Sequence, residues 1–186
     1  MEAMYRKMHE EGDPLNALNA DQTFDGSFIK PHIQTIGRFI KGSHSKSLLD
    51  YGCGKARIYQ QPKDLKTLWG LDEIQLYDPG CEPYQAYPSG QYDAVISTDV
   101  LEHITKKDMD WVLADILGFA RKLVFLNIAC YPAQKTRPNG ENAHITQENP
   151  GWWLDMIHGV KRTNPQIQNV FLIIADEDRK LVIVEL

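Results

Sequence analysis

The segment SLLDYGCGKA, residues 47–56, constrains the fold more than any other part of the chain. A short apolar run contains Asp50, and Gly52 and Gly54 follow directly. A buried strand that ends in a glycine turn and leads into a helix is typical of ligand-binding α/β sheets, because glycine lets a ligand approach the backbone. Free amide groups at the start of the following helix attract polar or negative groups. This order predicts a ligand site at the carboxyl end of the strand.

Apolar runs elsewhere predict more strands. Helical segments separate them, which favours parallel β-α-β units. The predicted fold class is α/β: a Rossmann-like, doubly wound, mostly parallel sheet with a C-terminal antiparallel hairpin. We treat 1–186 as a single domain with an N-terminal helical cap over 1–45 and a ligand-binding core over 46–186. The predicted strands cover 47–52, 74–79, 92–98 and 122–129, and the hairpin covers 169–186.

Helical spacing of apolar residues predicts a helix over 26–41, which Ser27 could cap, and another over 105–120. Thr105 and Asp108 form a capping-box pattern at the start of the second. A short helix is expected over 55–61, ended by Pro62. A last helix is expected to start at Asn149 and Pro150 and to close at Gly159. A polar loop over 130–148 precedes it.

Composition limits the classes of partner and compartment. With 186 residues, one domain is expected, and no apolar run reaches the ~18 residues of a membrane span. The three cysteines, Cys53, Cys81 and Cys130, are odd in number and contain no CxxC pair, which favours a reducing, cytoplasmic compartment. The net charge of −5 gives no general attraction to nucleic acid. Eight Lys and Arg residues over 28–66 are interpreted as solvated helix faces, with a local anion site as the alternative.

A second acid fits a nucleoside-binding site. Asp78 ends the second predicted strand, 28 positions after Asp50. An acidic side chain there can accept hydrogen bonds from both hydroxyls of a ribose.

Three segments resemble the class I S-adenosylmethionine (SAM) methyltransferases, in particular small bacterial and phage-type members. LLDYGCGKA (48–56) resembles their motif I, an acid, any residue and then Gly-x-Gly-x-Gly; LYDP (76–79) resembles the acidic end of their second strand, and YDAVISTDVLEHI (92–104) their fourth-strand segment. The resemblance runs from about Phe24 to the hairpin. It implies SAM as cofactor, S-adenosylhomocysteine (SAH) as product, and SAM contacts from Asp50, Tyr51, Gly52, Cys53, Gly54, Tyr77, Asp78, Pro79, Thr98, Asp99 and Val100.

The sequence departs from the family in two places. Ala56 stands where motif I has its third glycine. Only residues 79–91 separate Asp78 from Tyr92, and they contain three prolines and two glycines. We therefore expect the family's third strand to be shortened or missing. Its loop normally contacts adenine, so that contact is left open between Gln91, Tyr92 and a backbone group.

Methyl transfer requires an aligned nucleophile and, for a hydroxyl or ammonium, removal of a proton. The candidate catalytic residues are His144 and Tyr131 in the polar loop and His103 after the third strand. His144 could act as a base at its ordinary pKa or be a surface histidine. His103 is more often structural in this motif, and Glu102 is expected to be a local hydrogen-bond partner. Lys135 and Arg137 could hold an acidic or phosphorylated acceptor, although solvated charges are the simpler interpretation.

Several sharper functions are disfavoured. TDVL (98–101) stands directly after the strand within the segment 92–104, where amino-methylating DNA enzymes carry (Asp/Asn)-Pro-Pro-aromatic, and NPGW at 149–152 comes too late. The Pro-Cys pair of cytosine-C5 enzymes is absent, so a nucleic-acid substrate is disfavoured, while a substrate that carries a nucleotide stays open. The six histidines and the acids show no metal-ligand spacing, so no metal is predicted.

The sequence therefore predicts an enzyme that moves the SAM methyl group to oxygen or nitrogen of a small or medium acceptor: a sugar, nucleotide-sugar, lipid head group, metabolite or protein side chain. The alternative is a non-catalytic SAM- or SAH-binding module, or a partner-dependent subunit. A nicotinamide-dinucleotide oxidoreductase is disfavoured by the glycine pattern and by the lack of room for a substrate domain. A homodimer is compatible with the sequence, and no membrane partner is expected.

Overall fold

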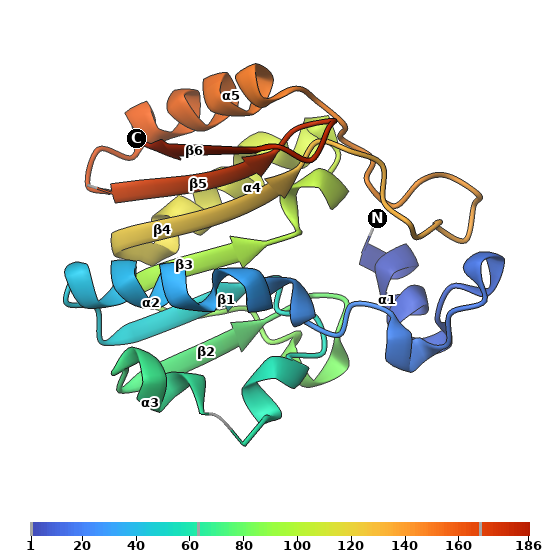
Figure 1. The fold of residues 1–186 in the computed structure, drawn as a ribbon, viewed down its shortest axis with the longest axis horizontal. Helices are drawn as coiled ribbons and strands as arrows, with labels where there is room; N and C mark the ends of the chain where they lie inside the picture. Colours follow the sequence, from blue (N-terminus) through green and yellow to red (C-terminus); the bar gives the residue numbers. More distant parts are fainter. Residues whose placement is uncertain (1, 63, 168) are drawn as a thin grey trace.

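The computed structural model describes residues 2–62, 64–167 and 169–186. It is an α/β structure in which one six-stranded sheet carries helices on both faces (Figure 1). The strands are β1 (Ser47–Tyr51), β2 (Glu73–Tyr77), β3 (Tyr92–Thr98), β4 (Ala120–Ala129), β5 (Asn169–Ala175) and β6 (Leu181–Glu185). The α-helices are α1 (Glu2–Glu11), α2 (Ile33–Gly42), α3 (Leu65–Trp69), α4 (Lys106–Phe119) and α5 (Pro150–Thr163). Short 3-10 helices are η1 (Pro14–Asn16), η2 (Ala20–Gln22), η3 (Ser27–His32), η4 (Arg57–Gln60), η5 (Glu82–Tyr84) and η6 (Leu101–His103).

The strand order is β2-β1-β3-β4-β5-β6, with β1 to β5 parallel and β6 antiparallel to β5 at the sheet edge. The predicted strands and the terminal hairpin are confirmed, and the sheet is compatible with a Rossmann-like arrangement. After β1 the chain places β2 on one side of it and then crosses back to place β3 on the other. Ligands bind at such a reversal, beyond the carboxyl ends of the strands.

Alternating side chains of the strands divide the core into two clusters. Leu48 points toward α2 and α3, where Ile36 and Trp69 are buried. Leu49 points to the opposite face, where α4 and α5 pack, and Trp153 is fully buried there. Figure 1 shows α2 and α3 in front of the sheet and α4 behind it. Both faces are therefore covered, as a mostly parallel sheet requires.

The chain between β2 and β3 is short and contains no strand. Residues 78–91 form only η5, so β2 is an edge of the sheet. This agrees with the prolines and glycines of the segment, which disfavour both a strand and a long helix.

Helix boundaries differ from the predictions at several points. The segment predicted as one helix over 26–41 begins as η3, capped by Gly26 rather than Ser27, and continues as α2. The short helix over 55–61 is only the 3-10 turn η4. The sequence pattern did not reveal α3, although Asp64 caps its start and Gly70 closes it in a left-handed conformation.

The two long helices follow the predictions more closely. Asn149 caps α5 by accepting the Trp152 amide, as predicted, but the helix continues past Gly159 to Thr163. Thr105 precedes α4, but the expected capping box is wrong. The Thr105 hydroxyl donates to the Asp108 carboxylate at 2.6 Å instead of capping a backbone amide.

The basic residues over 28–66 behave mainly as surface charges. Arg57 pairs with Asp21 at 2.6 Å, and the Lys66 side chain is exposed. Lys63 lies outside the described residues.

Within the part of the chain that the structure describes, no helix is both long enough and apolar enough to cross a membrane.

Asp93, in β3, ties the amino ends of three strands together. It accepts the Lys46 amide at 2.8 Å, Arg121 at 3.2 Å and Lys122 at 3.1 Å. Burial alone would raise the pKa of Asp93, but these hydrogen bonds together lower it. The Asp93 carboxylate therefore stabilises the fold at pH values above ~3.9, the ordinary carboxyl pKa. This contribution is lost as the pH falls through the lower pKa that Asp93 has in the folded state.

Replacing Asp93 by Asn should lower the free energy of unfolding by about 2 kcal/mol at pH 7, the scale of a charge-assisted hydrogen bond. Urea unfolding at pH 7 and near pH 3 measures the free energy of unfolding. The difference in this free energy between wild type and variant should be smaller at the lower pH. Asp110→Asn, at an exposed position of α4, is the control and should change stability by less than ~0.5 kcal/mol. An equal loss in both variants would contradict the role of Asp93.

Candidate functional site

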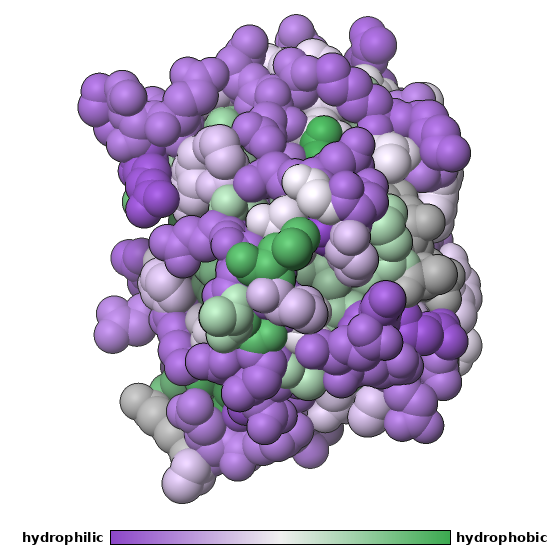
Figure 2. Space-filling model, turned by 90° about the vertical axis from the view of Figure 1, so that its right-hand side faces the viewer, coloured by the Kyte–Doolittle hydropathy of each residue, from purple (hydrophilic) through white to green (hydrophobic). Residues whose placement is uncertain are grey.

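A cavity of about 360 Å³ opens at the carboxyl ends of β1, β2 and β3. Every residue that the sequence predicts as a SAM contact, from Asp50 to Val100, lines it. Figure 2 views the molecule from this edge, where green hydrophobic residues gather near the centre within a purple hydrophilic surround. The volume of the cavity is in the usual range for small-molecule sites. The three sequence motifs therefore meet in one place.

The glycine turn after β1 is built for close backbone approach. Gly52 has φ +89°, and a Cβ there would lie 2.4 Å from Val100 Cγ2. Gly54 has φ +58°, and a Cβ there would lie 2.3 Å from the carbonyl oxygen of Phe24. Ala56, at the third glycine position of the motif, also has a left-handed φ of +50°. Glycine at the first two positions is thus required both by backbone conformation and by space.

Asp78 joins the glycine turn to the end of β2. Its two carboxylate oxygens accept the amides of Gly54 and Gly80, each at 2.9 Å. Burial raises the pKa of Asp78, and these amide hydrogen bonds oppose the rise. Each oxygen has a second lone pair, so the carboxylate can accept further hydrogen bonds from a ligand in the cavity.

Asp50 is buried at the base of the cavity and accepts the Tyr59 hydroxyl at 2.8 Å. Burial raises the pKa of Asp50 to about 7, the Tyr59 hydrogen bond opposes this, and the nearby Asp78 adds to it. Two acids with raised pKa values at one wall favour a ligand that presents hydrogen-bond donors or positive charge.

The N-terminal segment, predicted as a helical cap over 1–45, also lines the cavity, although no sequence pattern singled out its residues. Tyr5 and His9 of α1 line it, together with Phe24 and Phe28. The Nε2 atom of His9 lies 3.7 Å from the Asp78 carboxylate. Burial and then the Lys55 charge lower the pKa of His9 to about 4, so its ring is neutral at pH 7. Figure 1 shows α1 beyond the carboxyl ends of the strands.

An apolar end of the cavity lies where β1, β2 and α4 meet. Tyr51, Tyr77, Trp111 and Val112 line it, and Trp111 is exposed. Gln91 and Tyr92, the candidates for an adenine contact, are not among the lining residues; Gln91 instead donates to the Gly118 carbonyl. A flat aromatic ligand could therefore meet Trp111 and Val112 of α4, and Pro79 and Gly80 of the segment 79–91 line the cavity as well.

The candidate catalytic histidines lie side by side, with ring centroids 4.8 Å apart. His103 lines the cavity, whereas His144 and Tyr131 do not. His144 is buried, so the alternative of a surface histidine is wrong, and burial lowers its pKa below the ordinary value expected for a base. Glu102 accepts the Ala129 amide at 2.7 Å, which confirms its role as a local partner.

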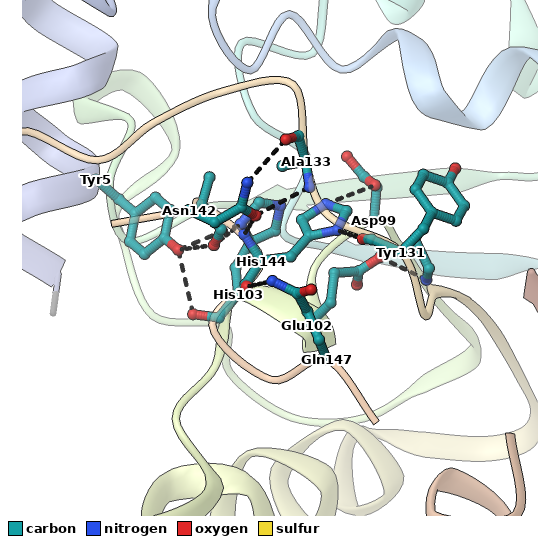
Figure 3. Close-up of polar contacts among 11 residues, drawn as sticks. Tyr5, Asp99, Glu102, His103, Tyr131, Ala133, Asn142, His144 and Gln147 are labelled. Carbon is teal, nitrogen blue, oxygen red and sulfur yellow. Dashed lines mark hydrogen bonds and ion pairs between the residues drawn. The ribbon is translucent and has the colours of Figure 1, made fainter. Parts of the chain in front are cut away.

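The polar loop is folded so that His144 turns inward. Asn142 accepts the amides of Ala133 and His144 at 2.9 and 3.0 Å and donates to the Ala133 carbonyl. The Tyr5 hydroxyl donates to the Ala143 carbonyl at 2.9 Å, which joins the loop to α1 (Figure 3). Sequence spacing alone could not place His144 beside His103, because the loop is held there by contacts between distant residues, those of Ala143 with Tyr5 and His103.

Donor atoms of Asp99, His103 and His144 all lie within 4.8 Å of one another. The sequence shows no metal-ligand spacing, because 40 residues separate the two histidines, and it therefore did not reveal this group. Asp99 has a left-handed φ of +59°, which is uncommon for a non-glycine residue and is often found at functional sites.

The two basic side chains of the loop are held within the protein. The Lys135 ammonium lies over the rings of Phe24 and Phe28, 4.8 and 5.3 Å from their centroids. Arg137 is buried and pairs with Glu141. Lys135 therefore lies near the cavity wall, and Arg137 serves the loop.

Comparisons with known proteins do not identify the chain: no family model, no curated protein and no solved structure matches it.

Proposed function

We propose that this protein is a SAM-dependent methyltransferase that transfers the methyl group to oxygen or nitrogen of a small or medium-sized acceptor. The observation that carries the proposal is the convergence of all the predicted SAM contacts on one cavity at the chain reversal between β1 and β3. The proposed fold is a Rossmann-like methyltransferase fold without the strand between Asp78 and Tyr92.

The polar contacts suit the parts of SAM. The Gly52–Gly54 turn would lie against the amino-acid end, and Asp78 would accept the ribose hydroxyls with its remaining lone pairs. Adenine would fit between Tyr77 and Trp111, because flat bases stack well on aromatic rings. This arrangement would replace an adenine contact from Gln91 or Tyr92, neither of which lines the cavity.

The chemistry is an in-line displacement. The acceptor atom forms a bond to the methyl carbon while the carbon–sulfur bond breaks, and the sulfur keeps the electron pair to give SAH. A hydroxyl or ammonium acceptor also loses its proton. The Asp99–His103–His144 cluster lies next to Thr98 and Val100 at the cavity wall, where it could assist that loss.

The aromatic and charged surroundings limit the acceptor. Phe28 is exposed at the cavity, and Lys135 lies over its ring, so an acceptor with an acidic or phosphorylated group would find a cation there. The cysteines are free and buried, which supports a reducing compartment such as the cytoplasm.

The runner-up is a module that binds SAM or SAH without turnover. The missing strand after Asp78 favours it, because that region normally helps to hold the cofactor. Incubation with methyl-labelled SAM and separate pools of sugars, nucleotide-sugars and proteins distinguishes the two. Labelled acceptor together with an equal amount of SAH supports the enzyme, and SAM binding without SAH formation in any pool supports the module.

A further inference from the structure

Three side chains of types that bind metal ions lie together beside the cavity, and two of them, Asp99 and His103, line it. Asp99 follows β3, His103 ends η6, and His144 comes from the polar loop (Figure 3). We propose that Asp99, His103 and His144 form a binding site for one divalent first-row transition-metal ion. Two imidazoles and one carboxylate are a donor set that suits Zn²⁺, Mn²⁺ or Fe²⁺ and leaves coordination positions open. The donor atoms, within 4.8 Å of one another, need only small side-chain rotations to surround an ion.

Hydrogen bonds orient both rings for ligation. The Nδ1 atom of His103 lies 2.9 Å from the Ala143 carbonyl, and that of His144 lies 2.6 Å from the Tyr131 carbonyl. A carbonyl only accepts, so each Nδ1 carries the proton and each Nε2 carries a lone pair. Metal-binding histidines commonly have this outer hydrogen bond to a carbonyl.

Among the residues that the structure describes, the two Nε2 atoms are poorly satisfied. Among the described residues, Nε2 of His103 is buried without a hydrogen-bond partner. Nε2 of His144 faces Asp99 Oδ1 at 3.8 Å, which is beyond hydrogen-bond distance, so two acceptor atoms face each other. A cation between them would satisfy both atoms.

A further buried oxygen atom lies beside the cluster. Glu102 directly precedes His103, and its Oε2 atom is buried and has no hydrogen-bond partner within the described residues. The nearby cationic side chains have other partners: the Lys135 ammonium lies over the Phe24 and Phe28 rings, and Arg137 pairs with Glu141. A metal ion at the cluster would therefore give these buried carboxyl groups a cationic partner.

The site would be open to the cavity, because Asp99 and His103 both line it. A role in catalysis rests on the proposed function. The ion would hold the oxygen of an acceptor hydroxyl near the SAM methyl group and lower the pKa of that hydroxyl, so that its proton leaves to water before the methyl group is transferred. A histidine nitrogen that holds an ion cannot also take up that proton. Ligation and base catalysis by these histidines are therefore distinct outcomes.

The test is metal binding by the full chain without SAM. After treatment with a chelator and its removal, the protein is titrated with Zn²⁺ and with Mn²⁺, and bound metal is counted by elemental analysis. We expect about one ion per chain. His103→Asn and His144→Asn should each weaken binding at least ~100-fold, since even loss of an outer partner costs ~10–100-fold.

His158→Asn is the matched control, because this histidine is exposed on α5, and it should bind metal like the wild type. Circular dichroism checks that each variant is folded. If the variants unfold, Co²⁺ added to the wild type should give two shifted, exchangeable ring N–H signals in proton NMR, one from each histidine. No bound ion in the folded wild type, or equal binding by all variants, would overturn the site. SAM binding is measured separately, so failure of either proposal is recognised independently.

Discussion

Replacing Gly54 by alanine is expected to abolish measurable SAM binding and to lower the free energy of unfolding by about 2–4 kcal/mol. Alanine in the left-handed region costs ~1–2 kcal/mol, and its Cβ would lie 2.3 Å from the backbone oxygen of Phe24. Relief of that contact would move the N-terminal segment or the glycine turn. Both line the cavity, so the site would lose its shape. Calorimetric SAM titration and urea unfolding measure the two effects.

Gly118→Ala is the matched control for Gly54→Ala. Gly118 lies in α4, and a Cβ there would meet nothing within 4 Å. This change should leave SAM affinity unaltered and raise stability by about 0.5–1 kcal/mol, because alanine is the better helix former. If Gly54→Ala binds SAM as tightly as the wild type, the glycine turn does not contact the cofactor.

Asp78→Ala is expected to weaken SAM binding by about 1–3 kcal/mol, the scale of charge-assisted hydrogen bonds. The carboxylate would lose its contacts to the ribose, and the amides of Gly54 and Gly80 would lose their acceptor. The same titration measures the change. Thermal unfolding without SAM shows how much of the loss comes from the fold alone.

Asp72→Ala controls for the loss of a carboxylate. Asp72 is exposed just before β2, at the end of the strand away from the cavity. Its replacement should leave SAM affinity unchanged. Unchanged affinity in Asp78→Ala as well would remove Asp78 from the cofactor site.

Much of the sheet could be predicted from sequence because its central strands are largely buried. Short apolar runs such as 92–98, bounded by turn residues, leave few alternatives. Local helix signals were less reliable. The α3 helix is only five residues long, so its apolar spacing is too brief to detect. Gly159 did not end α5, because tertiary packing of Val160 carries the helix further.

The convergence of these residues on one cavity could be predicted because parallel strands bring their carboxyl ends to one edge. Asp50 lies near the end of β1, and Asp78 and Asp99 follow β2 and β3, so chain order sufficed to bring them together. The wall formed by Tyr5 and His9 and the inward turn of His144 depend on long-range hydrogen bonds. No local pattern records such contacts, and the cluster with His103 was therefore missed.

The most direct test of the proposed function is a calorimetric titration of the purified wild-type chain with SAM, with NAD as a second titrant. We predict that one SAM binds per chain with micromolar affinity, ~1–100 μM, and that NAD gives no binding heat. A folded wild-type protein that binds no SAM, or binds NAD instead, would contradict it.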